Sequence, residues 1–458
     1  MAKIISTNPA NNYEIIGEVD MLTAEKIQKK VTQAQKAKTE WKELRVKRRV
    51  ELLRSIYKEF KERATEIAEL ISKEIGKPIS ESAREMNFYL EHFRWSLESA
   101  ESALKDEITH EDENSIHRIV YEPFGVAAVI TPWNFPFGMA IWGIIPNLIA
   151  GNTVVFKISE ECPLVGELIE KVMNNHDLPK GVFSEVYGAG DVGKILSESD
   201  IDLIWFTGST KVGQMLYKTA AEKFIKVVLE MGGSNPCIVF EDADLQNSLN
   251  TIYNGRFQNC GQVCNNIKRL IVHESISDEV VLRLKEIVET KQIGNPLDKT
   301  NDIGSLASER QLKLLKEQLQ DALSKGAKIV IGGKNPENLK GAYFEPTILT
   351  NITEDMRVYN EEVFGPILPV VIFKTEKEAV ELANDTIYGL GSRVISRDIE
   401  RANRVALQIE AGTVEINQGS RWLPCNPFGG YKKSGMGREH GVAGFRELCQ
   451  MKVVSMSR

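Results

Sequence analysis

Apolar residues recur at helical spacing through the segment 23–105. Thr23-Ala24-Glu25-Lys26 is typical of a helix N-terminus, and Ile27, Val31 and Ala34 follow at intervals of three and four. Two further helices are indicated by the same spacing of apolar residues: Leu52, Leu53, Ile56 and Phe60 in one, Phe88, Leu90, Phe93 and Leu97 in the other. We therefore expect this segment to be helical.

From residue 125 onward the pattern changes to short apolar strands separated by helical segments, the first of these helices at about 137–150. Strands of a first series are predicted at 126–130, 153–156, 183–187, 203–206 and 227–229. After Gly232-Gly233 a second series is predicted at 236–240, 269–273, 328–331, 368–373, 392–396 and 413–416. Strands that are apolar throughout and alternate with helices indicate an α/β fold with parallel sheets buried on both faces.

Two segments do not fit this alternation. The stretch 106–114 is acidic and leads into 115–121, where polar and apolar residues alternate as in a strand. This predicts an exposed ribbon that leaves the first domain. The tail 451–456 reads as a final strand with nothing after it to pack against, and such a strand often pairs with another subunit.

Composition and charge narrow the class of protein. The chain has 458 residues, of which 42% are hydrophobic, so disorder as the dominant state is excluded. The formal net charge of 57 − 64 = −7 argues against a nucleic-acid partner. The longest apolar run, 138–150, is interrupted by Pro146 and Asn147, which argues against a membrane span. The N-terminus has no apolar leader, and we expect a cytoplasmic protein.

The six cysteines and six histidines are scattered along the chain. This argues against a disulfide scaffold, and we expect no metal site because no set of four ligands has suitable spacing. Cys264 ends the sequence 257–264 and follows a turn that contains Gly261. At the end of an element the local field would lower the pKa of its thiol and favour a nucleophilic thiolate. A small packed core residue is the alternative.

Glu230 follows three apolar residues at a strand end, directly before a pair of glycines. Partial burial there would raise the pKa of its carboxyl group and make it a general base, although a solvated carboxylate is the alternative. Asn134 lies between two prolines after the strand 126–130. Its amide could donate to an oxyanion at the carboxyl edge of a parallel sheet, or simply belong to a rigid turn.

Two glycine-containing turns open helices after strands. Residues 188–193 fit the pattern G-x-G-x-x-G, which is weak evidence alone because no acidic residue ends a strand about 20 residues later. In the second turn, Gly208 and Ser209 could receive a pyrophosphate at a helix N-terminus, or Ser209 could only cap that helix.

These five motifs, in this order, resemble those of the aldehyde dehydrogenase superfamily. The resemblance continues through the segments 151–157, 361–366 and 427–435 and covers nearly the whole chain. It implies a Rossmann-like NAD-binding domain (1–107 and 123–231), an α/β catalytic domain (232–430), and a small β oligomerisation flap with the C-terminal tail (108–122 and 431–458). It also implies a homodimer or homotetramer, with an aldehyde as the small-molecule substrate.

The resemblance assigns roles to individual residues. Cys264 matches the nucleophile, Asn134 and the Cys264 backbone N–H the oxyanion hole, and Glu230 the base that activates water. The positions that match cofactor contacts are Ile130, Trp133, Lys157, Glu160, Gly188, Gly208, Ser209, Glu362 and Phe364, with Gly188 ranked below Ser209. A carboxylate at Glu160 would accept from a ribose 2′-hydroxyl and repel a 2′-phosphate, which favours NAD and leaves NADP as the alternative.

Four residues are candidates for the substrate site: Phe135, Trp142, Arg421 and Phe428. Arg421 could pair with a distal carboxylate, and we therefore expect a small semialdehyde such as succinate semialdehyde. A solvated loop position is the alternative for Arg421. Two other functions stay open: a CoA-acylating dehydrogenase, against which Glu230 counts, and a silent NAD-binding structural relative, against which Cys264, Glu230 and Asn134 count.

Overall fold

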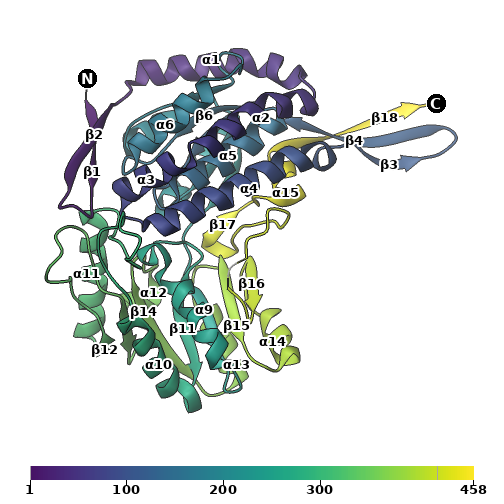
Figure 1. Ribbon diagram of the computed structural model, residues 1–458. Coiled ribbons are helices and arrows are strands. Elements are labelled where there is room, and N and C mark those ends of the chain that lie inside the picture. Colours follow the sequence, from purple (N-terminus) through teal and green to yellow (C-terminus); the bar gives the residue numbers. More distant parts are fainter. Residues whose placement is uncertain (1, 420) are drawn as a thin grey trace.

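The computed structural model describes residues 2–419 and 421–458. An N-terminal hairpin of β1 (Lys3–Asn8) and β2 (Glu14–Asp20) precedes four helices, which confirm the helical prediction for 23–105. These helices are α1 (Ala24–Glu43), α2 (Val46–Glu62), α3 (Ala64–Ile75) and α4 (Ile79–Ala103). Their apolar faces lie in the same cores as the first sheet, and Figure 1 shows them over one side of the molecule.

The first sheet has six strands in the order β17-β9-β8-β5-β6-β7. Five of them are parallel and match the first predicted series: β5 (Val126–Ile130), β6 (Thr153–Lys157), β7 (Phe183–Glu185), β8 (Leu203–Thr207) and β9 (Lys226–Glu230). The helices between them are α5 (Pro136–Ala150), α6 (Pro163–Asn174), α7 (Gly190–Glu198) and α8 (Thr210–Lys223). Helix α5 is buried almost all round, as its continuous apolar sequence requires.

The second sheet has seven strands in the order β12-β13-β14-β11-β10-β15-β16. The predicted strands are β10 (Asn235–Val239), β11 (Ile267–His273), β12 (Lys328–Ile331), β14 (Ile367–Phe373), β15 (Gly391–Ile395) and β16 (Thr413–Ile416). The prediction missed β13 (Thr347–Thr350), a run of four residues with threonine at both ends. The accompanying helices are α9 (Leu245–Phe257), η2 (Glu274–Ile276), α10 (Ser277–Glu289), α11 (Glu309–Ser324), α12 (Arg357–Asn360), α13 (Glu376–Asn384) and α14 (Ile399–Ala406).

A third sheet projects from the body of the molecule (Figure 1). It contains β3 (Glu107–Glu111), β4 (Ser115–Pro123) and the final strand β18 (Cys449–Ser457) in the order β18-β4-β3. The ribbon and the final strand are thus both present. The tail strand does have a partner in its own chain, because β18 pairs antiparallel with β4 from Cys449 to Ser457.

The C-terminal segment 431–458, predicted as part of the flap and the C-terminal tail, also contributes to the six-stranded sheet. Its strand β17 (Gly435–Met436), which follows η3 (Lys432–Ser434), pairs antiparallel with β9. Helix α15 (Gly441–Glu447) then packs against α4 and α5 before β18 begins. This pairing joins segments that are distant in sequence, which a strand of two residues cannot signal, and it places Gly435 opposite Glu230 at the end of β9. Within the described residues, no helix has the length and apolarity to cross a membrane.

Candidate active site

A cavity of about 250 Å³ opens where the carboxyl ends of β8 and β9 meet the loop before β11. All three predicted catalytic residues line it. Its wall contains the following side chains, apart from glycines and prolines: Tyr89, Trp133, Asn134, Phe135, Met139, Trp142, Thr207, Ser209, Glu230, Met231, Cys264, Gln311, Leu314, Glu362, Phe364, Trp422, Phe428 and Glu439.

The loop that carries Cys264 is conformationally strained. Asn259 and Cys260, inside the 3-10 turn η1 (Gln258–Gly261), have φ values of 50° and 53°. Gly261 follows at φ 76°, and a β-carbon there would collide with the Gly365 carbonyl oxygen. Asn235 holds the far side of the loop by donating from Nδ2 to the Cys264 carbonyl oxygen at 2.7 Å. Strain of this kind persists only where surrounding contacts over-determine the backbone.

The acidity of Cys264 differs from the prediction. Burial raises the pKa of its thiol to about 12, and the nearby Glu362 and Glu230 carboxylates add to this, while the Lys268 ammonium acts in the opposite direction. The local field at the end of a helix or strand was expected to lower this pKa. Burial of the thiol and the two nearby carboxylates outweigh that effect. These surroundings disfavour the thiolate form of Cys264, so its activation requires a base or a new positive charge.

Asn134 lies at the entry to α5 and is buried. Its Nδ2 donates one hydrogen to the Gln262 carbonyl oxygen at 3.0 Å, and Asn259 Nδ2 donates to the Asn134 carbonyl oxygen at 2.9 Å. These two bonds join the Asn134 loop to the cysteine loop. Since a primary amide carries two N–H groups, the second hydrogen of Asn134 remains for the cavity.

Two carboxylates of helix α4 bind the cysteine loop and the first turn of α5. Glu81 accepts the backbone N–H of Asn259 at 2.7 Å, and Glu85, one turn further on, accepts the backbone N–H of Gly138 at 3.1 Å. The second oxygen of Glu85 forms a fully buried ion pair with Lys77, whose ammonium lies 3.9 Å from the centre of the Phe135 ring. The two carboxylates thus fix the nucleophile loop and the first turn of α5 relative to each other.

Glu230 ends β9 and is buried, and among residues 2–419 and 421–458 neither of its carboxylate oxygens has a hydrogen-bond partner. Burial raises the pKa of Glu230 well above its usual range; the negative charge of Glu439 raises it further, and the Arg438 guanidinium lowers it. Burial also raises the pKa of Glu439 to about 8. Two buried carboxyl groups thus share one environment beside the cysteine, as general acid–base chemistry near neutral pH requires.

A second group of residues faces Cys264 from the segment before β14. Glu362 accepts the backbone N–H of Gly233 at 3.2 Å and lies 3.4 Å from the Lys268 ammonium. That ammonium lies 4.6 Å from the centre of the Phe364 ring, and Phe364 meets Trp133 edge to face at 5.5 Å. Glu362, Phe364 and Trp133, three of the predicted cofactor contacts, are therefore assembled in one wall.

The remaining predicted cofactor positions lie at the carboxyl edge of the six-stranded sheet. Ile130, Lys157 and the turns that hold Gly188 and Gly208 end or follow β5, β6, β7 and β8, which are neighbours in the sheet. Lys157 and Glu160 lie 3.7 Å apart as an ion pair. Ser209 caps α8 by accepting the Val212 backbone N–H at 3.4 Å. Of these positions only Gly208 and Ser209 line the cavity, so the carboxyl edge of the sheet extends beyond the cavity.

The predicted substrate residues separate into two groups. Phe135, Trp142 and Phe428 line the cavity together with Tyr89 and Trp422, with Tyr89–Trp142 at 4.9 Å and Trp422–Phe428 at 5.9 Å between ring centroids. Arg421 is exposed and is absent from the cavity wall, and its backbone N–H donates to Glu415 at 3.2 Å. Trp422, the next residue, supplies the side chain that reaches the cavity.

Several residues of the site were missed as candidates, and those with ionisable side chains are Tyr89, Lys268 and Glu439. Lys268 had a signal in sequence, because it stands inside an apolar strand, and burial lowers the pKa of its ammonium to about 8. Tyr89 and Glu439 had none, because their side chains approach the cysteine only through the packing of α4 and of the segment after β17. They show which part of the site depends on tertiary structure.

The two α/β sheets, and the half-buried cysteine that shares one cavity with an amide donor and a pair of buried carboxyl groups, are features expected of an α/β enzyme with a cysteine in its active site. The chain matches the model of the Aldehyde dehydrogenase family over residues 2–454. It therefore belongs to the aldehyde dehydrogenase family.

Named relatives cover nearly the whole chain. It is 39% identical to the peroxisomal aminoaldehyde dehydrogenase 1 of Pisum sativum, covering 99% of this chain and 92% of that protein. It is 37% identical to the glutarate-semialdehyde dehydrogenase of Pseudomonas aeruginosa, covering 98% and 93%. A crystal structure of betaine aldehyde dehydrogenase from Staphylococcus aureus in complex with NAD⁺ has a TM-score of 0.95 and 35% identity, covering 99% and 91%.

Proposed function

We propose that this protein oxidises an aldehyde to the free carboxylic acid with NAD. The observation that carries this proposal is the meeting of Cys264, Asn134 and Glu230 in one buried cavity. Cys264 adds through its sulfur to the aldehyde carbonyl as its thiol proton passes to water in the cavity, and the oxyanion of the resulting thiohemiacetal accepts hydrogen bonds from the second N–H of Asn134 and from the Cys264 backbone N–H. Loss of hydride leaves a thioester on the cysteine.

The residues present fit NAD. When bound, NAD supplies the hydride acceptor. Gly208 and Gly232 leave room that a side chain would fill, since a β-carbon at Gly208 would collide with the Phe206 ring and one at Gly232 with the Glu362 carboxylate. Glu362 would hold the nicotinamide ribose, Phe364 and Trp133 would flank the nicotinamide end, and Lys157 with Glu160 would hold the adenosine ribose. The Glu160 carboxylate favours NAD over NADP.

Hydrolysis of the thioester is the role we assign to Glu230. Its unpartnered carboxylate faces the cavity that holds Cys264, so a water between them can pass its proton to Glu230 as it attacks the thioester carbon. Release of the acid restores the thiol. This base supports hydrolysis over transfer to CoA, the alternative function, and the complete set of reacting groups supports an enzyme over a silent binding protein.

The cavity favours an aldehyde with a cationic far end. No lysine or arginine is present among the residues of its wall, all of which are described, whereas Glu230, Glu362 and Glu439 are. The rings of Tyr89, Trp142, Trp422 and Phe428 line the same cavity and contact one another, and the faces of aromatic rings attract ammonium groups. An ω-amino or trimethylammonium aldehyde fits this chemistry.

A small semialdehyde is the second candidate. Trp142 and Trp422 each have a buried indole N–H without a hydrogen-bond partner in the described structure, and the pair could donate to a distal carboxylate. Arg421, on which the expectation of succinate semialdehyde rested, is exposed and lies outside the cavity wall. A carboxylate held by neutral donors alone, next to buried acidic groups, is the less favourable occupant.

The test is NADH formation with four aldehydes of similar size, with and without CoA: 4-aminobutanal, betaine aldehyde, succinate semialdehyde and pentanal. We expect no CoA requirement, and kcat/KM for the cations at least about tenfold above that for succinate semialdehyde, as a cation–π contribution of ~1–2 kcal/mol would give. The reverse order would establish the semialdehyde. Cys264→Ala should abolish turnover, and activity that survives it would disprove the nucleophile assignment.

We further infer a homodimer or homotetramer that uses the projecting sheet. Met451, Val453 and Met456 on β18 are exposed apolar side chains, as is Ile108 on β3. Burying them against a second copy would remove this apolar surface from water. Sedimentation of the wild type and of a Val453→Lys variant tests this: the wild type should sediment as a dimer or larger, and a monomeric wild type would disprove it.

A further inference from the structure

Lys268 is a buried cation at the active site that no step of the proposed reaction uses. It stands on β11, four residues after Cys264, and its side chain is 1% exposed. A buried ammonium group is costly unless a charged group or hydrogen bonds compensate for its lost hydration. Here the compensating contacts all come from one segment, 362–364. They are the Glu362 carboxylate, the Val363 carbonyl oxygen at 3.3 Å and the Phe364 ring.

Glu362 is held through one of its two carboxylate oxygens. Oε1 lies 3.4 Å from the Lys268 ammonium and accepts the backbone N–H of Gly233 at 3.2 Å. Oε2 has no hydrogen bond within residues 2–419 and 421–458, and it lies over Gly232, where a β-carbon would come within 2.2 Å of it. Gly232 and Glu362 both line the catalytic cavity. Oε2 is therefore the oxygen that the hydroxyl group of a ligand can reach.

A second buried cation, Arg256, binds the same segment in a different way. Its guanidinium donates to the Val363 carbonyl oxygen at 3.2 Å and to the Gly365 carbonyl oxygen. These bonds hold the backbone of the segment without Lys268. Lys268, in contrast, contacts the carboxylate of Glu362 itself. Its distinct contribution is thus to the position of that side chain.

We propose that Lys268 is a positioning residue for the cofactor. This inference rests on the proposed function, in which Glu362 holds the nicotinamide ribose. The Lys268 ammonium attracts Oε1 of Glu362 and so directs Oε2 to the hydroxyl groups of the ribose. Without this cation the carboxylate keeps only its bond to the Gly233 N–H and turns more freely. A smaller fraction of molecules then presents Oε2 to the ribose, which weakens the binding of NAD in proportion.

The charge of Lys268 is lost at high pH, and NAD binding should follow it. Burial lowers the pKa of the Lys268 ammonium to about 8; the Glu362 carboxylate opposes this shift, the Arg256 guanidinium adds to it, and the Cys264 thiol acts in the same direction as Glu362. These are the charged and titratable groups around Lys268. The ammonium is present below about pH 8, so NAD should bind most tightly there. Its dissociation constant should increase as the pH rises through about 8.

The main test is Lys268→Met, with NAD binding measured by isothermal titration calorimetry at pH 7 and pH 9.5. Methionine has a similar length and no charge. At pH 7 we expect the dissociation constant to rise by about tenfold, the lower end of what a hydrogen bond to a charged group contributes. The wild type should show a rise of several fold between the two pH values, and the variant should show almost none. A purely structural role would leave this pH dependence in place.

A double-mutant cycle with Glu362→Gln tests whether Lys268 acts through Glu362. An amide cannot form the ion pair, so adding Lys268→Met to Glu362→Gln should change the dissociation constant of NAD by less than twofold. Equal effects of Lys268→Met in both backgrounds would overturn positioning through Glu362. Lys268→Gln, which can still donate to the Val363 carbonyl oxygen, is the second variant. It should also remove the pH dependence, and it keeps the test decisive if methionine prevents folding.

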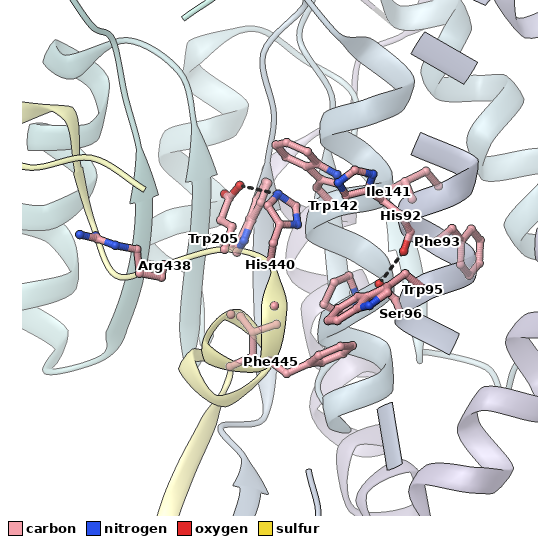
Figure 2. Close-up of a pocket in the computed structure, with 15 residues that line it drawn as sticks. His92, Phe93, Trp95, Ser96, Ile141, Trp142, Trp205, Arg438, His440 and Phe445 are labelled. Carbon is pink, nitrogen blue, oxygen red and sulfur yellow. Dashed lines mark hydrogen bonds and ion pairs between the residues drawn. The ribbon is translucent and has the colours of Figure 1, made fainter. Parts of the chain in front are cut away.

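Two control variants remove comparable side chains elsewhere. Lys325→Met removes a lysine that likewise contacts a carboxylate, that of Asp321 at 2.9 Å, and a backbone carbonyl oxygen, that of Asp355, outside the wall of the catalytic cavity. His92→Leu removes a buried polar side chain from the small cavity that Figure 2 shows, where its ring lies 5.4 Å from that of His440. Neither change should alter the dissociation constant of NAD.

Two results would overturn the positioning role of Lys268. One is a dissociation constant of Lys268→Met within twofold of the wild type at pH 7, and the other is a pH dependence that persists in this variant. Failure of the wild type to bind NAD at either pH would instead overturn the proposed function.

Discussion

Two pairs of buried glutamates flank the active site and differ in their partners. Glu81 and Glu85 on α4 are hydrogen-bonded to backbone N–H groups, and Glu85 is also paired with Lys77. Glu230 has no hydrogen-bond partner on either oxygen within the described residues, and one oxygen of Glu439 has none either. Burial is common to both pairs, so burial alone does not identify a reacting carboxyl group.

The hydrogen-bond partners of a buried carboxyl group therefore distinguish a residue that positions the backbone from one that can exchange a proton. A buried carboxylate whose oxygens already accept hydrogen bonds positions the backbone around it and has no free oxygen to accept a proton. A buried carboxyl group with open oxygens is costly, and it persists where a proton must be accepted and released. We therefore read Glu81 and Glu85 as positioning residues and Glu230 as the base, with Glu439 as its proton partner.

The largest expected effect is that of Glu230→Gln. Because an amide cannot accept the proton of the attacking water, steady-state turnover should fall by roughly 10²–10⁴-fold. Formation of the thioester does not need this base to accept water's proton, so a stoichiometric burst of NADH should remain. Rapid-mixing absorbance measures both quantities. Loss of the burst as well would show that Glu230 also activates Cys264.

Glu85→Gln should be the most destabilising change in the positioning pair. It leaves the Lys77 ammonium buried without its carboxylate, which costs about 3–5 kcal/mol in the free energy of unfolding. Urea unfolding measures this loss. The double variant Lys77→Met/Glu85→Gln is the control and should recover much of the stability, because no charge remains. If the double variant were as unstable as the single one, the ion pair would not be the cause.

The pH dependence should distinguish the reacting pair from the positioning pair. Thioester hydrolysis needs ionised Glu230, whose pKa lies well above its usual range, so the rate should rise by up to about tenfold per pH unit as Glu230 ionises and then level off. Stability should move in the opposite direction. The native state holds these protons more tightly than the unfolded chain, so the stabilisation present below about pH 4.5 is lost as the pH rises through about 8.

Glu439→Gln sharpens this prediction. Removing the negative charge of Glu439 lowers the pKa of Glu230, so the rate profile should shift to lower pH even though turnover at its plateau falls. Steady-state rates measured from pH 6 to 10 with a saturating aldehyde test the shift. An unchanged midpoint would show that the two carboxyl groups titrate independently.

The smallest expected effect is that of Glu81→Gln. The amide oxygen can still accept the Asn259 N–H, so we expect a loss of about 1 kcal/mol in stability and a change in turnover of only a few fold. Glu81→Leu is the contrasting variant, since it leaves that buried N–H without an acceptor. A similar result for both variants would mean that Glu81 does not hold the cysteine loop.

Most strands of the two α/β sheets could be predicted from sequence because each is a short apolar run between helices. The predicted bounds differ from the structure by at most two residues, as at β7 and β11. The exceptions are β13 and β17, whose four and two residues are too short for a pattern and depend on neighbours in the sheet. Pairing of β18 with β4 likewise depends on contacts between distant segments.

The same division between local sequence pattern and contacts of distant segments applies to the active site. The sequence indicated the candidate reacting groups, Cys264, Glu230 and Asn134, through the resemblance of their motifs to those of the aldehyde dehydrogenase superfamily, whereas each motif alone left an alternative open. Tertiary structure decided the acidity of these groups. It raised the pKa of Cys264, which the turn alone was expected to lower, because an apolar wall and two carboxylates outweigh the local field. It also placed Arg421 outside the cavity and brought Glu439 close to Glu230. Local sequence fixes which atoms can react, whereas burial and long-range packing fix their charge and their neighbours.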